Sequence, residues 1–294
     1  MRIFSSCFCL LLLLPVLLAG AGERLRVMSL NAEWFPGRAP RPTHAQQTQH
    51  LADVQRLLRD VDADLLLFQE IVKSDALEKA LAEQPDVSLY AISAFTNNPL
   101  QLAVAGRLPH VAAEAGHWAI PPDYTGPVPP RGIAFAAVEL PEGSLLLLFS
   151  LHLKSNYRGK DYHEQRNVQM REGAIHLFLA YAAAMERRFS DRRLGGILLG
   201  GDLNTLYPRS FIRGERTVNL LESGGFEHLG SNGLDHFWGK GIGDVAFSVF
   251  KAYKVSDHAP IILDITLDGE GASRRQPVEE TRSSQSSSKE SHGL

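Results

Sequence analysis

A carboxylate and an amide follow a short apolar run in the second half of the sequence. Residues 197–199 are apolar, Gly200 and Gly201 come next, and Asp202 and Asn204 stand two positions apart. Because side chains alternate along an extended chain, this carboxylate and amide would point the same way from the end of a strand. The two glycines would let a backbone or a ligand approach closely. A strand followed by an Asx turn is the alternative interpretation of the same residues.

The same pattern, a polar residue at the end of an apolar run, recurs along the chain. It is found at Asn31, Glu70, His152, Asp257 and His258. Each of these residues alone fits a turn or a satisfied polar group. Together they predict an active site, because the strand ends of a packed sheet share one rim, where loops build such sites.

Carboxylates, amides and two histidines on one rim suit a hard divalent cation. Mg²⁺ or Mn²⁺ prefers oxygen ligands and often bridges to phosphate, and Ca²⁺ also takes oxygen ligands. A zinc site that uses His152 and His258 is an alternative, although their spacing is not that of a zinc motif.

The elements that would position these residues are mostly strands. Apolar or alternating runs predict strands over 25–30, 64–69, 87–93, 101–106, 111–118, 132–139, 144–151, 197–199, 226–229, 234–238, 245–250 and 259–267. A period of 3.6 predicts helices over 44–60 and 163–188, with shorter ones after Ser74 and within 205–223. Many strands adjoin as hairpins, and several are apolar throughout, as in strands buried on both faces. The pattern predicts a four-layer α/β sandwich, with two packed mixed β-sheets flanked by helices.

Residues 1–22 have the pattern of a secretory signal peptide. Arg2 precedes an apolar stretch over 10–18, and small residues follow at 19–21. The stretch is shorter than the roughly 20 residues of a membrane span, so we expect no stable membrane anchor. We expect export to the periplasm or the extracellular medium. The only cysteines, Cys7 and Cys9, lie in this segment, which leaves the mature chain without a disulfide or a thiolate metal site.

Residues 23–267 are long enough for one large domain with a substantial core. After position 267 the chain is rich in Gly, Ser, Arg and Glu, which predicts a disordered tail over 268–294. Without Arg2 and this tail, the chain keeps 25 basic and 28 acidic residues. A protein that grips nucleic acid by charge alone is usually more basic, whereas metal-binding carboxylates make an enzyme more acidic.

The polar strand ends resemble the motifs of the endonuclease/exonuclease/phosphatase superfamily, the DNase I-like metal-dependent phosphodiesterases. The resemblance extends over residues 25–267 and is strongest to secreted bacterial nuclease-like members. It rests on six short motifs in the order of the family: Met28-Ser29-Leu30-Asn31, Leu67-Phe68-Gln69-Glu70, Ser150-Leu151-His152-Leu153-Lys154-Ser155, Gly201-Asp202-Leu203-Asn204, Leu234-Asp235-His236 and Ser256-Asp257-His258.

The resemblance implies metal ligands and a general base. Glu70 would be the principal metal ligand, and Asn31 and Asp257 would complete the site. Glu33 loosely matches a second acidic residue of many members. His258 would be the general base that activates water, oriented by Asp235.

The resemblance also implies groups that bind the substrate. His152 and Asn204 would bind the scissile phosphate, and Asp202 would position the attacking water or hold a second cation. His236 would face the other side of its strand and take no part in catalysis.

Basic residues follow His152 and could contact flanking phosphates. They are Lys154, Arg158, Lys160, Arg166 and Arg171. The loop over 120–131, with Trp118, Tyr124 and Arg131 in or beside it, could stack a base and bind a phosphate. A solvated loop with ordinary charges and a proline-stiffened surface loop are the respective alternatives.

The leading functional prediction is an exported, divalent-metal-dependent phosphodiesterase that hydrolyses DNA or RNA. A phospholipase C-type enzyme and an inositol-phosphate phosphatase would share the same catalytic residues, and a non-catalytic binding protein would share the fold. A phospholipase would want an exposed apolar hairpin. Residues 247–250 are better explained as a core strand. Nothing in the sequence indicates an oligomer, so a monomer is the default expectation.

Overall fold

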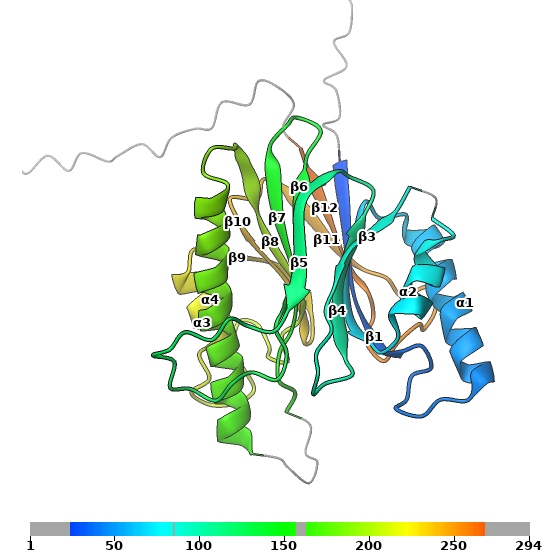
Figure 1. Cartoon of the computed structure of the whole chain (residues 1–294), viewed down its shortest axis with the longest axis horizontal. Helices are drawn as coiled ribbons and strands as arrows, with labels where there is room; N and C mark the ends of the chain where they lie inside the picture. Colours follow the sequence, from blue (N-terminus) through cyan, green and yellow to red (C-terminus); the bar gives the residue numbers. More distant parts are fainter. Residues whose placement is uncertain (1–23, 85, 157–162, 268–294) are drawn as a thin grey trace, which may run out of the picture.

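The apolar runs form two β-sheets that pack face to face (Figure 1). The computed structural model describes residues 24–84, 86–156 and 163–267. In these residues, sheet 1 has the order β11 (Val245–Val249), β12 (Ile261–Thr266), β1 (Arg24–Phe35), β2 (Leu65–Ile71), β4 (Gln101–Gly106) and β3 (Ser88–Ile92). Sheet 2 has the order β5 (His110–Gly116), β6 (Ile133–Glu139), β7 (Leu145–His152), β8 (Leu194–Asp202), β10 (Asp235–Lys240) and β9 (Glu227–Asn232).

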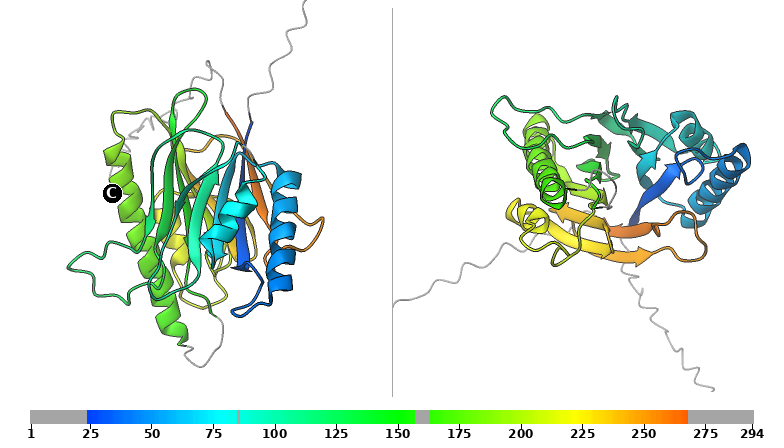
Figure 2. Two further views of the ribbon diagram at one scale, coloured as in Figure 1. Left: turned by 45° about the vertical axis from the view of Figure 1, so that its right-hand side comes forward. Right: turned by 90° about the horizontal axis from the view of Figure 1, so that it is seen from below.

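Helices cover the outer face of each sheet (Figures 1 and 2). Helices α1 (His44–Val61) and α2 (Ser74–Leu81) pack on sheet 1, and α3 (Glu164–Arg188) and α4 (Thr217–Ser223) pack on sheet 2. Helix α1 begins at a capping box, in which Thr43 and Gln46 each satisfy a backbone N–H of the other. The described residues therefore form the four-layer α/β sandwich predicted from the sequence, with two mixed sheets between helices.

Alternation within the apolar strands explains why both faces of each sheet are buried. In β2, Leu65 and Leu67 face the layer between the sheets, whereas Leu66 and Phe68 face α1 and α2. In β7, Leu146 and Leu148 face the layer between the sheets, and the residues between them face α3. A strand buried on both sides reads as a continuous apolar run, which is the pattern seen in the sequence.

Two parallel strand pairs bring the polar strand ends to one rim. Strands β1 and β2 are parallel, with Asn31 beside Gln69, and β7 and β8 are parallel, with His152 beside Asp202. Strand β10 is antiparallel to β8 and begins opposite its end, which pairs Asp235 with Asp202. Residues that are far apart in sequence therefore meet at the same end of the sandwich.

The two glycines near the end of β8, Gly200 and Gly201, have the close-packing role proposed from the sequence. A Cβ at Gly200 would lie 2.5 Å from Leu67 Cδ1, across the layer between the sheets. At Gly201, whose φ is +147°, a Cβ would lie 2.0 Å from the backbone oxygen of Leu151 in β7. Only glycine fits there without a shift of the strands that carry His152 and Asp202.

A buried polar bridge joins the two sheets beneath the rim. Gln69 of β2 donates from Nε2 to Ser150 Oγ of β7 at 2.9 Å and to Ser29 Oγ of β1 at 3.3 Å. The Ser150 hydroxyl donates to the backbone oxygen of Phe68 at 3.1 Å. Because Glu70 directly follows Gln69 and His152 follows Ser150 by two positions, the bridge fixes the position of one strand end relative to the other.

Several boundaries differ from the predicted ones. β1 continues past residue 30 to Phe35, and β2 continues through Glu70 to Ile71, with a register irregularity where the two pair. β5 ends at Gly116, two residues early. Strand β11, which contains Phe247, is half-buried at the edge of sheet 1.

The predicted signal segment, residues 1–22, and the predicted tail, residues 268–294, lie outside the described residues. Within the described part of the chain, no helix has the length and apolar character needed to span a membrane.

Candidate active site

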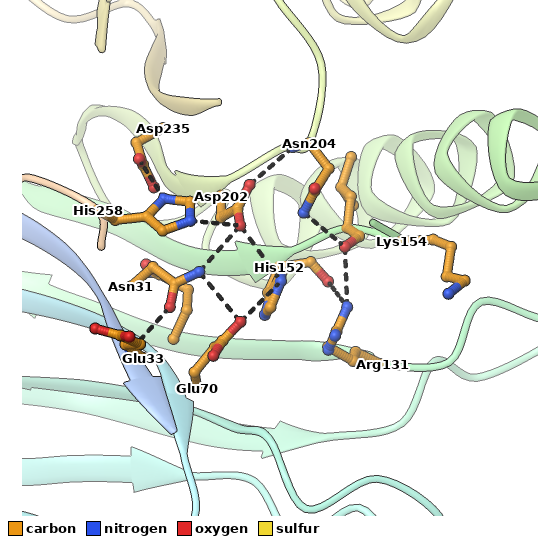
Figure 3. Close-up of polar contacts among 12 residues, drawn as sticks. Asn31, Glu33, Glu70, Arg131, His152, Lys154, Asp202, Asn204, Asp235 and His258 are labelled. Carbon is orange, nitrogen blue, oxygen red and sulfur yellow. Dashed lines mark hydrogen bonds and ion pairs between the residues drawn. The ribbon is translucent and has the colours of Figure 1, made fainter. Parts of the chain in front are cut away.

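The polar strand ends form one cluster that both sheets share (Figure 3). Sheet 1 supplies Asn31 and Glu70, sheet 2 supplies His152 and Asp202, and His258 comes from the loop before β12. All the site residues predicted at strand ends are described by the structure, and hydrogen bonds and ion pairs link most of them directly.

Irregular backbone aims the carboxylate of Glu70 into the cluster. Glu70 has a left-handed φ of 60°, at the register irregularity between β1 and β2. Its Oε2 accepts the backbone N–H of Trp34 at 3.2 Å, and its Oε1 accepts Asn31 Nδ2 at 3.3 Å. Burial raises the pKa of Glu70, although its bond to Asn31 and the charge of Arg131 oppose that rise. Strained backbone of this kind is concentrated at functional sites.

The Asn31 amide connects the two sheets. Its Nδ2 donates both to Glu70 and, at 3.0 Å, to Asp202 Oδ2. Its Oδ1 accepts the backbone N–H of Glu33 at 3.2 Å, which fixes the orientation of the amide. One amide thus holds two carboxylates from different sheets close together.

His258 and Asp235 form a hydrogen-bonded pair. Nδ1 of His258 lies 2.7 Å from Asp235 Oδ2, and Nε2 of the same ring lies 3.9 Å from Asp202 Oδ2. Burial lowers the pKa of His258, but the bond to Asp235 and the charges of Asp235 and Asp202 outweigh it and raise the pKa to about 9. The bond fixes the tautomer of the neutral ring, so Nε2 is the nitrogen that can exchange a proton with a ligand.

Asp202 is the buried centre of the cluster. Its Oδ1 accepts the backbone N–H of Asn204 at 2.9 Å, in the Asx turn considered as the alternative from the sequence. Burial and the charge of Asp235 raise the pKa of Asp202 to about 7. The turn and the functional assignment are therefore compatible, because the turn fixes the carboxylate that faces His258.

His152 is buried and neutral. Its Nε2 lies 3.4 Å from Asp202 Oδ2 and 3.8 Å from Glu70 Oε1. Burial, with the charges of Arg131, His258 and Lys154, lowers the pKa of His152 well below its usual range. Nδ1 has no hydrogen-bond partner within the described part of the structure. A neutral imidazole at this position can donate one hydrogen bond without adding charge.

Asn204 and Arg131 lie on the side of the cluster opposite His258 (Figure 3). Asn204 has a left-handed φ of 50° and donates from Nδ2 to the backbone oxygen of Leu153 at 3.3 Å. Arg131 is buried and donates from Nη1 to the backbone oxygens of His152 and Leu153 at 3.3 and 2.9 Å. Burial lowers the pKa of Arg131 to about 10, against the opposing charges of Glu70 and Asp202. Its guanidinium supports the loop after β7 from beneath.

Two further carboxylates border the cluster near Glu70. Asp257 is exposed, and its backbone N–H donates to Glu33 Oε2 at 2.8 Å. Burial and the neighbouring charge of Asp257 raise the pKa of Glu33. The charge of Asp257 also contributes to the raised pKa values of Glu70 and His258. Glu33, which matches the family pattern only loosely, thus lies in the same group of acidic side chains as Asp257, which matches it more closely.

The donor set fits a hard divalent cation. Burial raises the pKa values of Glu70 and Asp202, so the positive charge near these carboxylates does not fully offset the cost of burying their negative charge. Most of the potential ligand atoms in the cluster are oxygens, which a hard divalent cation prefers. Ligand atoms of Asp202, Asp235 and His258 all lie within 4.8 Å of one another, so this buried group could hold a metal ion. This group differs from the predicted ligands Asn31, Glu70 and Asp257. An ion on His258 Nε2 would occupy the nitrogen that a general base needs, so the two uses of that ring exclude each other.

The predicted basic wall lies only partly at the surface. Lys154 is half-buried, and Arg166 is exposed in the first turn of α3. The exposure of Arg166 fits both the predicted phosphate contact and the alternative of an ordinary surface charge. Arg171, which we expected to face flanking phosphates, is instead completely buried and bonds Glu215 at 2.7 Å. Arg158 and Lys160 lie outside the described residues.

The loop over 120–131 offers less to a substrate than predicted. Trp118 is buried in the core beside α3 and cannot stack a base. The Tyr124 hydroxyl donates to the backbone oxygen of Pro127 at 3.1 Å, and the ring packs against Gly173 of α3. His236 bonds the backbone oxygen of Thr205 at 2.9 Å, away from His258.

The structural role of Arg171 in the site region was not predicted. Arg171 donates to the backbone oxygen of Lys154 and to Asn156 Oδ1, and Asn156 in turn donates to the backbone oxygen of Asn204. A signal was present in the sequence, because Arg171 falls in helical register with Ala174 and Phe178 on the buried face of α3. A positively charged residue on the apolar face of a predicted helix indicates a buried ion pair.

Comparisons with known proteins agree with this geometry. The sequence profile described as "Endonuclease/Exonuclease/phosphatase family" matches residues 28–258. No curated protein matches the sequence.

Three solved structures illustrate the shared fold. An endonuclease/exonuclease/phosphatase family protein from Bacteroides thetaiotaomicron is 15% identical, with a TM-score of 0.59 over 87% of this chain and 99% of that one. The human Nocturnin catalytic domain with bound sulfate is 14% identical, with a TM-score of 0.60 over 82% and 93%. Beta toxin from Staphylococcus aureus is 11% identical, with a TM-score of 0.58 over 81% and 99%.

The matched residues begin in β1, end at His258 and include every polar strand end described above. The chain therefore belongs to the endonuclease/exonuclease/phosphatase family, whose members are hydrolases acting on phosphoester bonds.

Proposed function

We propose that the chain is an exported, divalent-metal-dependent phosphodiesterase that cleaves nucleic acid by attack of an activated water. The observation that carries the proposal is the arrangement around Asp202. The His258–Asp235 pair lies on one side of this carboxylate and the neutral His152 on the other, with Glu70 joined to it through Asn31.

His258 is the proposed general base. Asp235 holds Nδ1 and leaves Nε2 to accept a proton from water near Asp202. With a pKa of about 9 the ring is protonated at neutral pH, so it must lose that proton before it can act as a base. A cation near Glu70 and Asp202 would favour the neutral ring, because its charge offsets the carboxylates that raise the pKa.

His152 and Asn204 are the proposed partners of the scissile phosphate. Attack places extra negative charge on the phosphoryl oxygens, and fixed hydrogen-bond donors stabilise that charge. His152 is fixed by burial and Asn204 by its bond to Leu153. Glu70, Asn31 and Asp257 would hold Mg²⁺ or Mn²⁺, and a bound cation would further neutralise the phosphate. Asp202 would orient the attacking water.

Nucleic acid is the proposed substrate because positive charge flanks the phosphate-binding residues. Lys154 follows His152 closely and points away from the carboxylates in Figure 3. Arg166 is exposed at the start of α3, after the loop that leaves β7. Both can contact phosphates beside the one that is cut. Export rests on the signal-like pattern of residues 1–22.

The test is a hydrolysis assay with Mg²⁺, Mn²⁺ or EDTA. Substrates are plasmid DNA, linear DNA, RNA, bis-p-nitrophenyl phosphate, sphingomyelin and inositol phosphates. His258→Ala and Asp202→Ala should retain the fold and lose about 10²–10³ in rate, the usual effect of removing one catalytic group. His44→Ala, which removes an exposed histidine at the start of α1, is the matched control.

Metal-dependent cleavage of DNA or RNA that is lost in His258→Ala supports the proposal. Turnover of bis-p-nitrophenyl phosphate or a lipid, without cleavage of any nucleic acid, would support phosphodiester hydrolysis but reject nucleic acid as the substrate. Near-normal turnover by His258→Ala would reject the assignment of the base.

A further inference from the structure

The loop between β8 and α4 presents an alternating row of aromatic and cationic side chains beside the site. The row consists of Tyr207, Arg209, Phe211 and Arg213, and all four are exposed. Phe211 is 53% exposed and Tyr207 is 40% exposed, which places both among the five exposed large hydrophobic residues of the described chain. No carboxylate of the described residues forms an ion pair with Arg209 or Arg213. The row is thus open to a ligand.

The row begins close to the proposed phosphate-binding residues. Tyr207 follows Asn204 by three positions, and the backbone oxygen of Asn204 accepts a hydrogen bond from Asn156 at 3.4 Å. Figure 1 shows this loop at the end of the sandwich where β7 and β8 end. A polymer whose phosphate lies at Asn204 would therefore reach the row with its neighbouring nucleotides.

The loop is held rigidly from its inner side. Glu215 accepts two hydrogen bonds from Arg171, each of 2.7 Å, and both side chains are fully buried. Ser210 Oγ donates to Glu215 Oε2 at 2.6 Å and accepts the backbone N–H of Ile212 at 3.1 Å. Ser210 and Glu215 thus face inward, whereas the four residues of the row face outward. Exposed groups on a fixed backbone lose less conformational entropy on binding than those on a mobile loop.

The ring of Tyr207 is also held in place. It stacks on the imidazole of His228 with centroids 3.7 Å apart and an interplanar angle of 14°, and it meets Trp238 edge-on at 5.6 Å. With one ring face covered by His228, the exposed part of Tyr207 is a flat and immobile surface. A flat aromatic surface of this kind suits the stacking of a nucleobase.

We propose that Tyr207, Arg209, Phe211 and Arg213 form a binding platform for unpaired nucleotides next to the scissile phosphate. The inference rests on the proposed nuclease function and narrows its substrate to single-stranded nucleic acid. Aromatic rings stack on bases that have left a duplex, and the arginines between them bind the phosphates that link those bases. Two large apolar side chains separated by arginines offer little area for insertion into a membrane.

The experiment compares wild type with Phe211→Ala and Arg213→Ala in Mg²⁺. It measures KM and kcat for a single-stranded oligonucleotide, as DNA and as RNA, and kcat/KM for bis-p-nitrophenyl phosphate. Phe211→Ala should raise KM for the single strand by roughly 5- to 100-fold, the usual effect of losing one stacked base. Arg213→Ala should raise KM and reduce the slope of log kcat/KM against log salt by about 0.7. Neither change should alter turnover of the small diester.

Matched controls lie at the opposite end of the sandwich. Val111→Ala removes another exposed apolar side chain, and Arg193→Ala removes an exposed arginine between α3 and β8. Both should leave KM unchanged. Thermal unfolding of each variant shows whether the fold is retained.

The outcomes separate this inference from the proposed function. Cleavage of single strands with KM unchanged in both loop variants would overturn the platform and leave the nuclease intact. Cleavage of duplex only would overturn the single-strand assignment. Diester turnover with no cleavage of nucleic acid by wild type would reject the proposed function and the platform with it. Loss of binding to anionic phospholipid vesicles in Phe211→Ala, with KM for the oligonucleotide unchanged, would assign the row to a membrane instead.

Discussion

Asp235 acts on His258 through both a hydrogen bond and a charge. The 2.7 Å contact holds the ring, and the negative charge stabilises its protonated form. Burial opposes that effect, so the pKa of about 9 reflects the balance of the two. At the scale of single residues, Asp235 therefore helps to set the pH at which His258, the proposed base, loses its proton.

Asp235→Asn tests this role. Removal of the charge should lower the pKa of His258 toward its ordinary value of 6.5, so that the acidic limb of the pH–rate profile moves to lower pH. The rate itself should fall by about 10² or more, because a neutral partner stabilises the protonated ring less. The measurement is kcat/KM for bis-p-nitrophenyl phosphate between pH 5 and pH 10, at constant Mg²⁺.

His236→Gln is the matched control, because its ring bonds Thr205 rather than His258. An acidic limb that stays in place in Asp235→Asn would show that a different group titrates.

At the scale of elements, the site depends on how closely β7 and β8 approach. A Cβ at Gly201 would meet the backbone oxygen of Leu151, and that atom belongs to a central strand that cannot move freely. Because His152 and Asp202 directly follow these two residues, a displacement there would separate the groups that we propose to flank the substrate.

Gly201→Ala should therefore destabilise the protein and lower its activity together. Overpacking of a core costs about 1–3 kcal/mol, and the positive φ adds strain. For a domain of this size, each kcal/mol lowers Tm by roughly 2–4 °C, which thermal unfolding would detect. Gly116→Ala, where a Cβ would meet nothing within 4 Å, should leave Tm nearly unchanged. Equal Tm values for the two variants would contradict the close-packing role of Gly201.

The sequence predicts the elements well and their arrangement only in part. Apolar runs locate strands such as β2 and β7, because both faces of each sheet are buried. Strand order depends on pairings such as Arg26 with Asp264, which lie 238 positions apart and have no local signal. Asp235 and His258 could be paired by resemblance to the family. The backbone irregularity that aims Glu70 arises from tertiary packing and could not be read from local spacing. The burial of Arg171 had a local signal in its helical register, but its partner Glu215 lies 44 positions away and had none.

At the scale of the whole molecule, buried charge links stability to pH. Asp202 and His258 hold protons more tightly in the folded protein than in the unfolded chain, because their pKa values are raised to about 7 and about 9 from 3.8 and 6.5. Four buried or half-buried histidines act in the opposite direction below pH 6.5, because burial lowers their pKa values: His50, His152, His228 and His236. Each raised pKa adds to the free energy of unfolding, and this contribution is fully present below about pH 4 for Asp202 and below about pH 6.5 for His258. It is lost as the pH rises through about 7 and about 9 respectively.

Metal-free protein should therefore lose stability between about pH 6.5 and pH 9, where the histidines with lowered pKa values are neutral in both states, and Mg²⁺ should restore it. Because the cation competes with protons for carboxylates, its effect should be larger at pH 8 than at pH 5. At a concentration of about 100 times Kd it would add about 2.7 kcal/mol, or roughly 5–10 °C in Tm. Thermal unfolding with Mg²⁺ or EDTA at both pH values measures this. An equal shift at both pH values would contradict the placement of the cation among these carboxylates.

The order of the strands also decides when the enzyme can first act. Sheet 2 comes from one continuous stretch, residues 110–240, whereas sheet 1 needs both the first and the last strands of the domain. Strand β1 can complete its pairing only after β12 has been synthesised, and His258 precedes β12 by three positions. A ribosome that has reached residue 257 has therefore not yet supplied the proposed base. A nascent domain that stops before His258 lacks both the proposed base and the last strand of sheet 1, and we expect the proposed activity to appear only once that strand has been added.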